Sequence, residues 1–376
     1  MDIARAHQEF QRTRFFPGLD GLRCLSIVLV VAYHVSGVHT GFLGRGYLGV
    51  ALFFAISGFL ITTLLLREQD SHGQISLGRF YARRSLRIFP LYYAVLGIYT
   101  LLVLFAEKGA EEKAEFFSNL PAFLTYTSNW FVALEANNPD KRIIFYFAWS
   151  LATEEQFYLL WPGVMRTLRK AGAVLFMTGL LAISVWAPWA METGRLDGSL
   201  LWVRILASFA PPICMGCLAA LAVHSREGFG WVYRVLGHAW VPPVALAAVV
   251  AAVAANGTPF WLTSVLMTAL VVSSCIRTKH ALMPLLTFSW ARYIGTVSYG
   301  IYLLHMLAFN LVRRLLPDQG FAVYFVLTMA LSVLLAGLSF RYFESWFLRL
   351  KDRLGAGPAP GRRESPAQAP VSNPTP

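Results

Sequence analysis

The sequence is poor in charged residues for its length. Only 14% of its 376 residues are Asp, Glu, Lys or Arg, whereas 56% are hydrophobic. A soluble domain has about 25% charged residues, so the composition excludes an ordinary soluble enzyme. The apolar residues form repeated runs of about 17–25 residues, long enough to cross a bilayer. Because lipid cannot satisfy open backbone groups, the composition predicts an all-α, polytopic transmembrane helix bundle.

Cysteine is scarce as well. Cys24, Cys214, Cys217 and Cys275 all lie in or beside apolar runs, which excludes a disulfide framework. Cys214 and Cys217 have the spacing of a redox or metal pair, but no second cysteine pair or histidine cluster accompanies them. We therefore interpret this pair as buried helix packing and expect no metal.

Negative charge is the scarcer sign, with 20 Asp and Glu against 32 Lys and Arg and a net charge of +12. The basic residues lie mostly in short loops between apolar runs, so they indicate membrane topology rather than a nucleic-acid partner. The first apolar run contains Arg23 and His34 and lacks a small-residue cleavage site. We therefore expect a retained transmembrane helix and not a signal peptide.

Ten apolar runs are predicted to cross the membrane. They lie near 22–39, 47–66, 88–106, 148–165, 172–191, 204–223, 239–255, 260–277, 293–312 and 321–343. Basic loops face the cytoplasm, and the loops obey this rule if the weaker segment 116–134 does not cross. Both termini are then cytoplasmic, and 107–147 is an outer loop with an interfacial or re-entrant segment. Arg313 and Arg314 would lie outside, a mild violation of the rule.

This topology divides the chain into three parts. Residues 1–21 form a cytoplasmic N-terminal segment, and residues 22–345 form the membrane domain. Residues 346–376 form a cytoplasmic tail that is first basic and then rich in Pro and Ala. Such a composition cannot bury a core, so it predicts disorder.

The first apolar run places a cation and an imidazole on one helix face, in "RCLSIVLVVAYH" from Arg23 to His34. Eleven residues at about 100° each end about 20° past three helical turns, and they span roughly 16 Å. Arg23 is then at the cytoplasmic entrance and His34 near mid-membrane. Ionisable groups in a membrane face the bundle interior or a wet cavity, and an imidazole suits a general base. The alternative is a histidine that packs through a hydrogen bond to a neighbouring helix.

A basic cluster precedes the third run. Arg84 and Arg87 are three residues apart, which puts them on one helix face, and Arg83 adjoins them. One interpretation is topology alone. The other is a forked site for a phosphorylated cytoplasmic ligand.

Two other runs carry polar residues at helical spacing. Glu154, in "WSLATEEQFYLLWP", lies about 9 Å below the outer start of its helix, near the predicted level of His34. It would orient or charge-stabilise the histidine or bind an acceptor hydroxyl, unless it is simply buried against Arg or Tyr. Ser298, Tyr302 and His305 share one face of another helix, for which aromatic packing is the alternative.

A pair of small residues, Ser57-Gly58, lies within "FFAISGFL". Small residues let helices approach closely, so we interpret this step as a packing contact. No nucleophile elbow surrounds Ser57, which argues against a serine nucleophile.

Five stretches together resemble one known family. They are "FPGLDGLR…YH", "FFAISGFLI", "RFYARRSLRIFPLYY", "WSLATEEQFYLLWP" and "IGTVSYGIYLLH". Through them, about residues 15–345 are similar to the integral-membrane acyltransferase family 3, which includes O-antigen and exopolysaccharide O-acetyltransferases and macrolide acyltransferases. Its members typically have ten membrane helices. Some also carry an extra helix and a secreted SGNH-type hydrolase domain, whereas this sequence ends in a tail.

The resemblance implies an acyl-CoA donor, most often acetyl-CoA. The family's pattern of a basic residue, ten residues and a histidine falls on Arg23 and His34. Its R-x-x-R pair falls on Arg84 and Arg87, which with Arg83 are placed to hold the CoA phosphates on the cytoplasmic side. Arg23 would guide the pantetheine arm towards His34. That histidine would act as general base or as a covalent acyl relay.

The resemblance also implies O-acyl transfer to a hydroxyl. The family's Trp-Ser-Leu…Glu motif falls on Trp149, Ser150 and Glu154, and Glu154 is the second catalytic candidate. Trp149, Ser150, Tyr302 and His305 are candidates for acceptor binding or support. The expected acceptor is a surface carbohydrate or its lipid-linked precursor, which approaches from the outer side of a bacterial cytoplasmic membrane.

Three alternatives stay open, of which the first is an export accessory that only binds polysaccharide; the other two are as follows. One is acylation of a macrolide or another small metabolite by the same chemistry. The other is a proton-coupled transporter or flippase without chemistry, because buried His, Glu and Arg also mark such proteins. The sequence shows neither the inverted repeats nor the matching Gly/Pro-broken helices that are typical of transporters.

Overall fold

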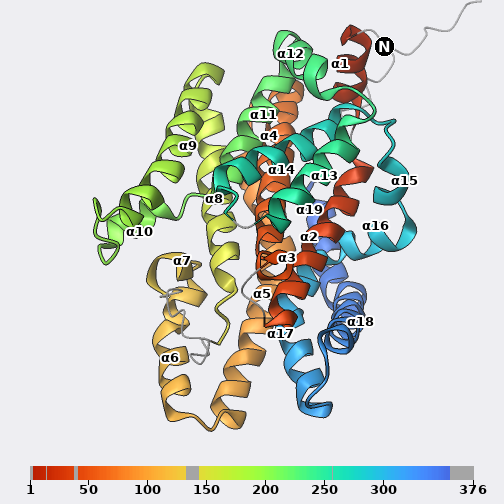
Figure 1. Ribbon diagram of the computed structural model, residues 1–376. Coiled ribbons are helices and arrows are strands. Elements are labelled where there is room, and N and C mark those ends of the chain that lie inside the picture. Colours follow the sequence, from red (N-terminus) through yellow and green to blue (C-terminus); the bar gives the residue numbers. More distant parts are fainter. Residues whose placement is uncertain (1–2, 14, 38–40, 133–143, 256, 356–376) are drawn as a thin grey trace, which may run out of the picture.

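The computed structural model describes residues 3–355 except 14, 38–40, 133–143 and 256. Every regular element in this part of the chain is a helix. The long helices run side by side in one bundle (Figure 1). In chain order the elements are α1 (Ile3–Arg12), α2 (Pro17–Ser36), α3 (Gly41–Gly44), α4 (Leu48–His72), α5 (Leu77–Ala106), α6 (Ala110–Leu124), α7 (Ser128–Phe131), α8 (Ala148–Thr167), α9 (Lys170–Glu192), α10 (Leu201–Ala207), α11 (Pro211–His224), α12 (Arg226–Leu236), α13 (Val241–Ala254), α14 (Phe260–Ile276), α15 (Met283–Leu286), α16 (Ser289–Thr296), α17 (Ser298–Leu315), α18 (Phe321–Ser339), the π-helical turn η1 (Phe340–Glu344) and α19 (Ser345–Gly355).

The bundle is built from helices of membrane length. In the described residues α2, α4, α5, α9 and the segment Phe321–Leu350 are each long and apolar enough to cross a membrane. Three pairs reach that length only when joined across a bend: α10 with α11 (47°), α12 with α13 (69°) and α16 with α17 (78°). This gives five candidate spans, or up to eight if each bent pair is one span. The predicted all-α transmembrane bundle is confirmed, whereas the side on which each terminus lies stays a prediction.

Two of the ten predicted spans fall outside this set. The run 148–165 is α8, a helix of membrane length that carries Glu154, Glu155 and Arg166. The run 260–277 is α14, which is apolar but has only 17 residues. Adding these two helices to the eight candidates above matches the ten predicted runs one to one.

Proline and glycine mark several helix ends. Proline occupies the first turn of α2, α11 and α13, where its missing N–H would have no helical partner anyway. Ala210, just before Pro211, is extended, as expected for a residue that precedes proline, and the α10–α11 pair bends there. α2 ends at Gly37 with φ 60°, a left-handed conformation that glycine adopts without strain.

α4 and α11 meet through their backbones. A Cβ added at Gly58 would meet the backbone of Ile213, and one added at Gly216 would lie 2.8 Å from the backbone nitrogen of Phe59. Small residues permit such close approach in membrane bundles, so the packing interpretation of Gly58 is confirmed. Because successive residues point about 100° apart on a helix, Ser57 faces a different side of α4.

Glycines also allow close packing around α2, the helix that carries Arg23 and His34. A Cβ at Gly49 of α4 would meet the backbone of Ser26, and one at Gly295 of α16 would meet the backbone of Asp20. α2 therefore lies directly against α4 and α16. These contacts fix the rotation of α2 about its own axis, and with it the direction of its polar stripe.

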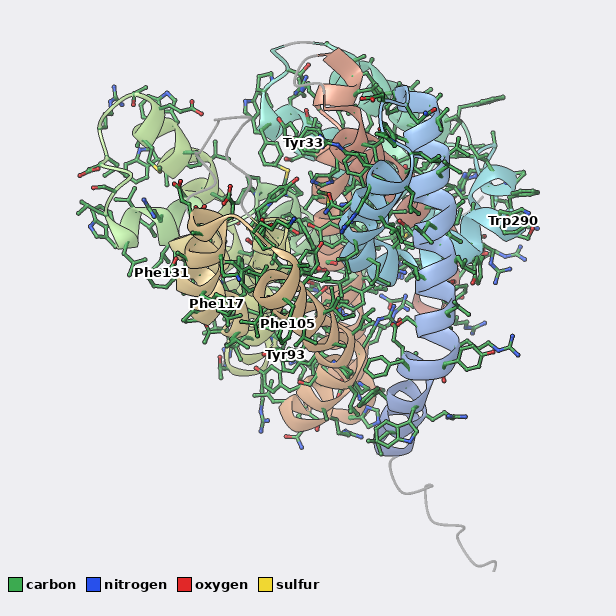
Figure 2. All side chains as sticks on the ribbon, turned by 90° about the horizontal axis from the view of Figure 1, so that it is seen from below. Tyr33, Tyr93, Phe105, Phe117, Phe131 and Trp290 are labelled. Atoms are coloured by element: carbon green, nitrogen blue, oxygen red, sulfur yellow. The ribbon has the colours of Figure 1, made fainter. Side chains whose placement is uncertain are left out.

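Large apolar side chains cover much of the outer surface. Figure 2 shows Tyr93, Phe105, Phe117 and Phe131 along the side formed by α5, α6 and α7, with Trp290 on another side. Phe105 is 80% exposed and Trp290 is 64% exposed. Apolar exposure on this scale is unfavourable in water and is expected where side chains face lipid.

The predicted outer loop 107–147 contains two helices, α6 and α7. Pro121 lies inside α6, and residues 125–127 separate the two helices. Both lie beside one half of α5 rather than along its full length (Figure 1). Neither is among the candidate spans. The side of the membrane that this segment faces stays a prediction, and residues 133–143 lie outside the described part of the chain.

The basic part of the predicted tail is helical. Residues up to Gly355 form α19, which packs against α5. The ordered bundle therefore extends past residue 345. The Pro- and Ala-rich remainder, 356–376, lies outside the described residues.

Replacing Gly58 by alanine is expected to destabilise the bundle, because the new methyl group would meet the Ile213 backbone. Overpacking of this kind costs about 1–3 kcal/mol, and the measurement is the thermal unfolding midpoint in detergent. Gly97 in α5 is a matched control, since nothing lies near an added Cβ there. Gly97→Ala should keep or raise the midpoint because alanine favours helix. Equal midpoints for the two variants would contradict the direct backbone contact.

Candidate active site

A cavity of about 310 Å³ lies among Arg23 of α2, Ser57 of α4, Arg87 of α5, Glu154 of α8 and Tyr302 of α17. This volume is within the range of small-molecule sites. We call it the central cavity. It is lined by residues from five helices that are far apart in the sequence, so it exists only in the assembled bundle.

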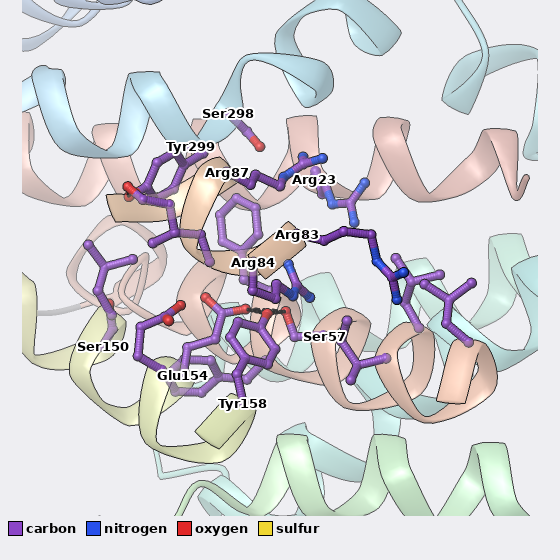
Figure 3. A pocket seen from close by; sticks show the side chains of 18 of the residues that line it. Arg23, Ser57, Arg83, Arg84, Arg87, Ser150, Glu154, Tyr158, Ser298 and Tyr299 are labelled. Atoms are coloured by element: carbon purple, nitrogen blue, oxygen red, sulfur yellow. Dashed lines mark hydrogen bonds between the residues drawn. The ribbon is translucent and has the colours of Figure 1, made fainter. Parts of the chain in front are cut away.

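Four arginines gather on one part of the central cavity (Figure 3). Two of them are paired: Arg23 bonds Asp20 one turn earlier at 2.9 Å, and Arg83 bonds Glu68 at 3.3 Å. Asp20 pairs with Arg23 alone, whereas Glu68 is shared, because Arg79 also lies 3.8 Å from it. Both cavity arginines thus already have a carboxylate within salt-bridge distance.

The other two arginines are not neutralised. In the described residues, neither Arg84 nor Arg87 lies within salt-bridge distance of a carboxylate. The Arg84 guanidinium rests on the ring of Tyr158, 3.9 Å from its centroid, while Arg87 lines the cavity. A guanidinium keeps its proton at any physiological pH. Neither guanidinium is held in a salt bridge, although Glu154 and Glu155 also line the cavity, so both remain available to a phosphorylated ligand.

A hydroxyl–carboxylate cluster faces these arginines (Figure 3). Glu154 Oε1 accepts hydrogen bonds from the hydroxyls of Ser57 and Tyr158, whose oxygens are 3.0 Å apart. The cluster joins α4 to α8 and holds Tyr158 under Arg84. Glu154 thus has a structural link to the arginines, through the ring of Tyr158.

The far end of the cavity is closed by Ser150 and Tyr302. The Tyr302 hydroxyl donates to the carbonyl of Phe147 at 2.8 Å, so the Ser150 hydroxyl, 2.6 Å away, donates to the tyrosine oxygen. Both side chains are buried. This bond joins α8 to α17 and separates the cavity from the next layer of the bundle.

That next layer holds the two membrane histidines. His34 Nδ1 lies 3.0 Å from His305 Nε2, and the rings are 4.8 Å apart between centroids. His305 is 0% exposed, whereas His34 is half-buried and contacts the rings of Tyr33 and Tyr146. His305 follows Tyr302 by three residues, so the histidine pair is about one helical turn, roughly 4.5 Å along the axis, beyond the cavity end.

The structure unites most of the predicted site residues. Those that line the central cavity are Arg23, Arg83, Arg84, Arg87, Ser150, Glu154 and Tyr302. His34 and His305 pair just beyond it. Trp149 lies apart: it lines a second pocket on the other side of α8, with Asn129 and Trp130. In the described residues no hydrogen bond joins Glu154 to His34, whose neighbour is His305 instead.

Sequence reasoning missed three residues of the site. Tyr158 had a usable signal, since Ser150, Glu154 and Tyr158 recur every fourth residue on one face of α8. Ser57 was considered as a packing residue and as a nucleophile, but not as a partner of Glu154. Glu68 gave no signal, because nothing in one sequence shows which arginine a distant carboxylate will meet.

The part of the chain that the structure describes offers no group of three His, Cys, Asp or Glu side chains that could hold a metal ion. Cys214 and Cys217 are free thiols buried on α11. The thiol of Cys217 lies 3.6 Å from the carbonyl of Gly58. The pair therefore belongs to the α4–α11 contact, as its sequence interpretation predicted.

The sequence match decides the family. A family model described as an acyltransferase domain matches residues 16–341, which include both histidines and all four cavity arginines. The chain belongs to acyltransferase family 3. The predicted identity of a multi-pass membrane acyltransferase is thereby confirmed.

Relatives of this acyltransferase have related names. Peptidoglycan O-acetyltransferase OatA of Listeria monocytogenes is 27% identical over 362 residues, which are 88% of this chain and 56% of the relative. O-acetyltransferase OatA of Staphylococcus aureus is 27% identical over 370 residues, 88% of this chain and 57% of the relative. The acyltransferase described here therefore spans a little over half the length of these relatives. No solved structure matches it at a significant level.

Removing the Tyr158 hydroxyl is expected to weaken the α4–α8 contact. Tyr158→Phe takes one donor from the partly buried Glu154 carboxylate but keeps the ring against Arg84, and such a bond is worth about 1.5–3 kcal/mol. Tyr158→Leu also removes the cation–π contact, a further loss of about 0.5–2 kcal/mol. The measurement is unfolding in detergent.

Tyr81→Phe is the control for this prediction. The Tyr81 hydroxyl bonds only the carbonyl of Leu159, at 2.8 Å and near the surface, so its loss should change stability far less. If Tyr158→Phe and Tyr81→Phe unfold at the same midpoint, the Glu154 cluster does not stabilise the bundle.

Proposed function

We propose that the protein moves an acetyl group from acetyl-CoA to a hydroxyl of a cell-surface carbohydrate or its lipid-linked precursor. One observation carries this proposal. Arg84 and Arg87, which form no salt bridge in the described residues, face a cavity that ends one helical turn from a pair of histidines. Family membership supplies the reaction class, acyl transfer. The names of the relatives, one of them a peptidoglycan O-acetyltransferase, support acetyl as the group and carbohydrate as the acceptor.

The arginines suit the phosphates of the donor. CoA carries a pyrophosphate and a ribose phosphate, and guanidinium groups bind such anions in a forked, charge-assisted geometry. Arg84 and Arg87 take the anion because they have no carboxylate of their own. Arg23 and Arg83, already paired, line the path. In this proposal Glu154 holds Tyr158, and thereby Arg84, in place for the donor.

The acetyl end must then travel from the arginines towards His34. The pantetheine arm is long and thin, and the central cavity leads from Arg87 to Tyr302. The last barrier is the neutral hydrogen bond between Ser150 and Tyr302. A bond of this type contributes only about 0.5–1.5 kcal/mol, so donor binding can open it. The cavity thus gives a route for the thioester to the histidine layer.

The chemistry requires one base. His34 takes the proton of the acceptor hydroxyl, and the oxygen attacks the thioester carbonyl. A carbon–oxygen bond forms, the carbon–sulfur bond breaks, and the imidazolium returns the proton to the leaving thiolate. The products are an O-acetyl ester and CoA with a free thiol. In a relay variant His34 carries the acetyl group first, and the same atoms balance over two steps.

His34→Ala is expected to abolish acetylation in the cell. General-base assistance contributes about 10²–10⁴-fold to such reactions. The measurement is mass spectrometry of surface polysaccharides and lipid-linked glycans from a deletion strain that is complemented with wild type or variant. Wild type should restore one acetyl mass unit on a defined glycan, and His34→Ala should not. His72→Ala, which changes an exposed histidine at the end of α4, is the control and should restore it fully.

The other results of this experiment are equally informative. Normal acetylation by His34→Ala would refute the role of His34. Loss of a mass other than that of an acetyl group would mean that the donor carries a different acyl group. No change in any glycan would refute the carbohydrate acceptor and direct the search to a secreted small molecule.

Arg84→Ala and Arg87→Ala should each raise the KM for acetyl-CoA tenfold or more, because a charge-assisted hydrogen bond is worth about 1.5–3 kcal/mol. Arg83→Ala should raise it less, since the Arg83 side chain is already held by Glu68. The measurement is acetyl transfer in detergent at a series of donor concentrations.

Arg166→Ala is the matched control for loss of one positive charge. Arg166 is exposed near the end of α8 and does not line the central cavity. An unchanged KM for acetyl-CoA in the Arg84 and Arg87 variants would refute donor binding and favour the interpretation that both arginines only set the membrane topology.

A further inference from the structure

The hydrogen bonds around the histidine pair define where its protons lie. His305 Nδ1 is 2.6 Å from the carbonyl oxygen of Tyr302. A carbonyl oxygen only accepts hydrogen bonds, so His305 carries its proton on Nδ1. In the neutral ring the other nitrogen, Nε2, then has a free lone pair. That lone pair faces His34 Nδ1 at 3.0 Å.

His34 Nδ1 is consequently surrounded by acceptors. The carbonyl oxygen of Val30 lies 2.9 Å away, and the Nε2 lone pair of His305 lies 3.0 Å away. Both contacts require a proton on His34 Nδ1. The reactive lone pair of His34 is therefore on Nε2, the nitrogen that neither contact engages.

We propose that His305 is a positioning residue that selects this tautomer of His34 and holds its ring in place. The assignment rests on the proposed function of His34 and deepens it. A base or acyl acceptor at Nε2 needs the proton on Nδ1, and the chain from the Tyr302 carbonyl through His305 to His34 supplies this arrangement before substrate binds. When His34 takes a proton on Nε2, its Nδ1–H keeps both acceptors, so the imidazolium is stabilised without rearrangement.

A role of His305 in packing alone would require different properties of its side chain than a role in positioning His34. Its ring is fully buried and contacts the rings of Phe147 and Tyr302, so a packing role needs only a side chain of suitable volume. A positioning role needs an acceptor at the place of Nε2. The two roles can be separated with amides, because a glutamine places its terminal group near Nε2 of a histidine and an asparagine places it near Nδ1.

The test compares His305→Gln with His305→Asn in the purified full-length protein, with acetyl-CoA as donor. Glutamine can accept from His34 Nδ1 and should keep most of the wild-type kcat. Asparagine reaches only the Tyr302 carbonyl and should lower kcat roughly tenfold to hundredfold, as loss of such a supporting hydrogen bond typically does. The KM for acetyl-CoA should stay unchanged in both variants, since the phosphate-facing arginines are untouched. Equal kcat values for the two folded variants would overturn the proposal.

A second measurement uses the wild-type protein and needs no variant to be active. ¹⁵N NMR of histidine-labelled protein distinguishes Nδ1–H from Nε2–H rings, and loss of signals in His34→Ala and His305→Gln assigns the two residues. We expect the proton on Nδ1 in both. A proton on Nε2 of either ring would overturn the proposal whatever the activity of the variants.

These readouts separate the positioning role from the proposed function. Absence of acetyl transfer by the wild type towards any glycan acceptor would refute the function but leave the tautomer result valid. Full activity of His305→Asn, with His34→Ala inactive, would refute the positioning role and leave the function standing.

Discussion

A guanidinium that lines a cavity inside a membrane bundle keeps its charge and therefore needs a partner of opposite charge. Arginine does not lose its proton at physiological pH, and an unpaired charge in a low-dielectric interior is strongly unfavourable. In the central cavity this requirement is met for Arg23 by Asp20 and for Arg83 by Glu68. The remaining arginines face the cavity without such a partner in the described chain. This pairing pattern leaves two arginines of the cavity without a salt bridge, which is the feature on which the proposed anion site depends.

Direct backbone contacts make this arrangement rigid. Lipid offers no hydrophobic drive for one helix to bury against another, so close packing and interhelical hydrogen bonds have to hold the bundle. Gly58 and Gly216 bring α4 against α11, while Ser57 and Glu154 tie α4 to α8. Two neighbouring residues, Ser57 and Gly58, thus connect α4 to different helices. Ser57 and Glu154 line the central cavity, and the close approach at Gly58 holds α4, which forms part of the cavity wall, against α11.

The sequence predicts which residues lie on helices and which share a face, because both depend on local periodicity and hydropathy. Ten apolar runs, the stripe from Arg23 to His34 and the grouping of cavity arginines could all be predicted in this way. The partner of each polar group could not, because it depends on how distant helices are rotated and bent. His34 meets His305, which is 271 residues away, and Glu154 meets Ser57, which is 97 residues away. Trp149 and Ser150 are adjacent in one motif, yet they face different pockets.

Tyr302 connects the two halves of the proposed reaction. Its hydroxyl closes the far end of the central cavity with Ser150, and its carbonyl oxygen accepts a hydrogen bond from Nδ1 of His305. A donor that opens the Ser150 bond therefore acts on the residue whose backbone holds the histidine pair. The side chain can rotate while the carbonyl stays in the helical backbone, because a χ1 change moves the hydroxyl and leaves the peptide group in place. One residue can thus admit the thioester while the proton arrangement at His34 is preserved.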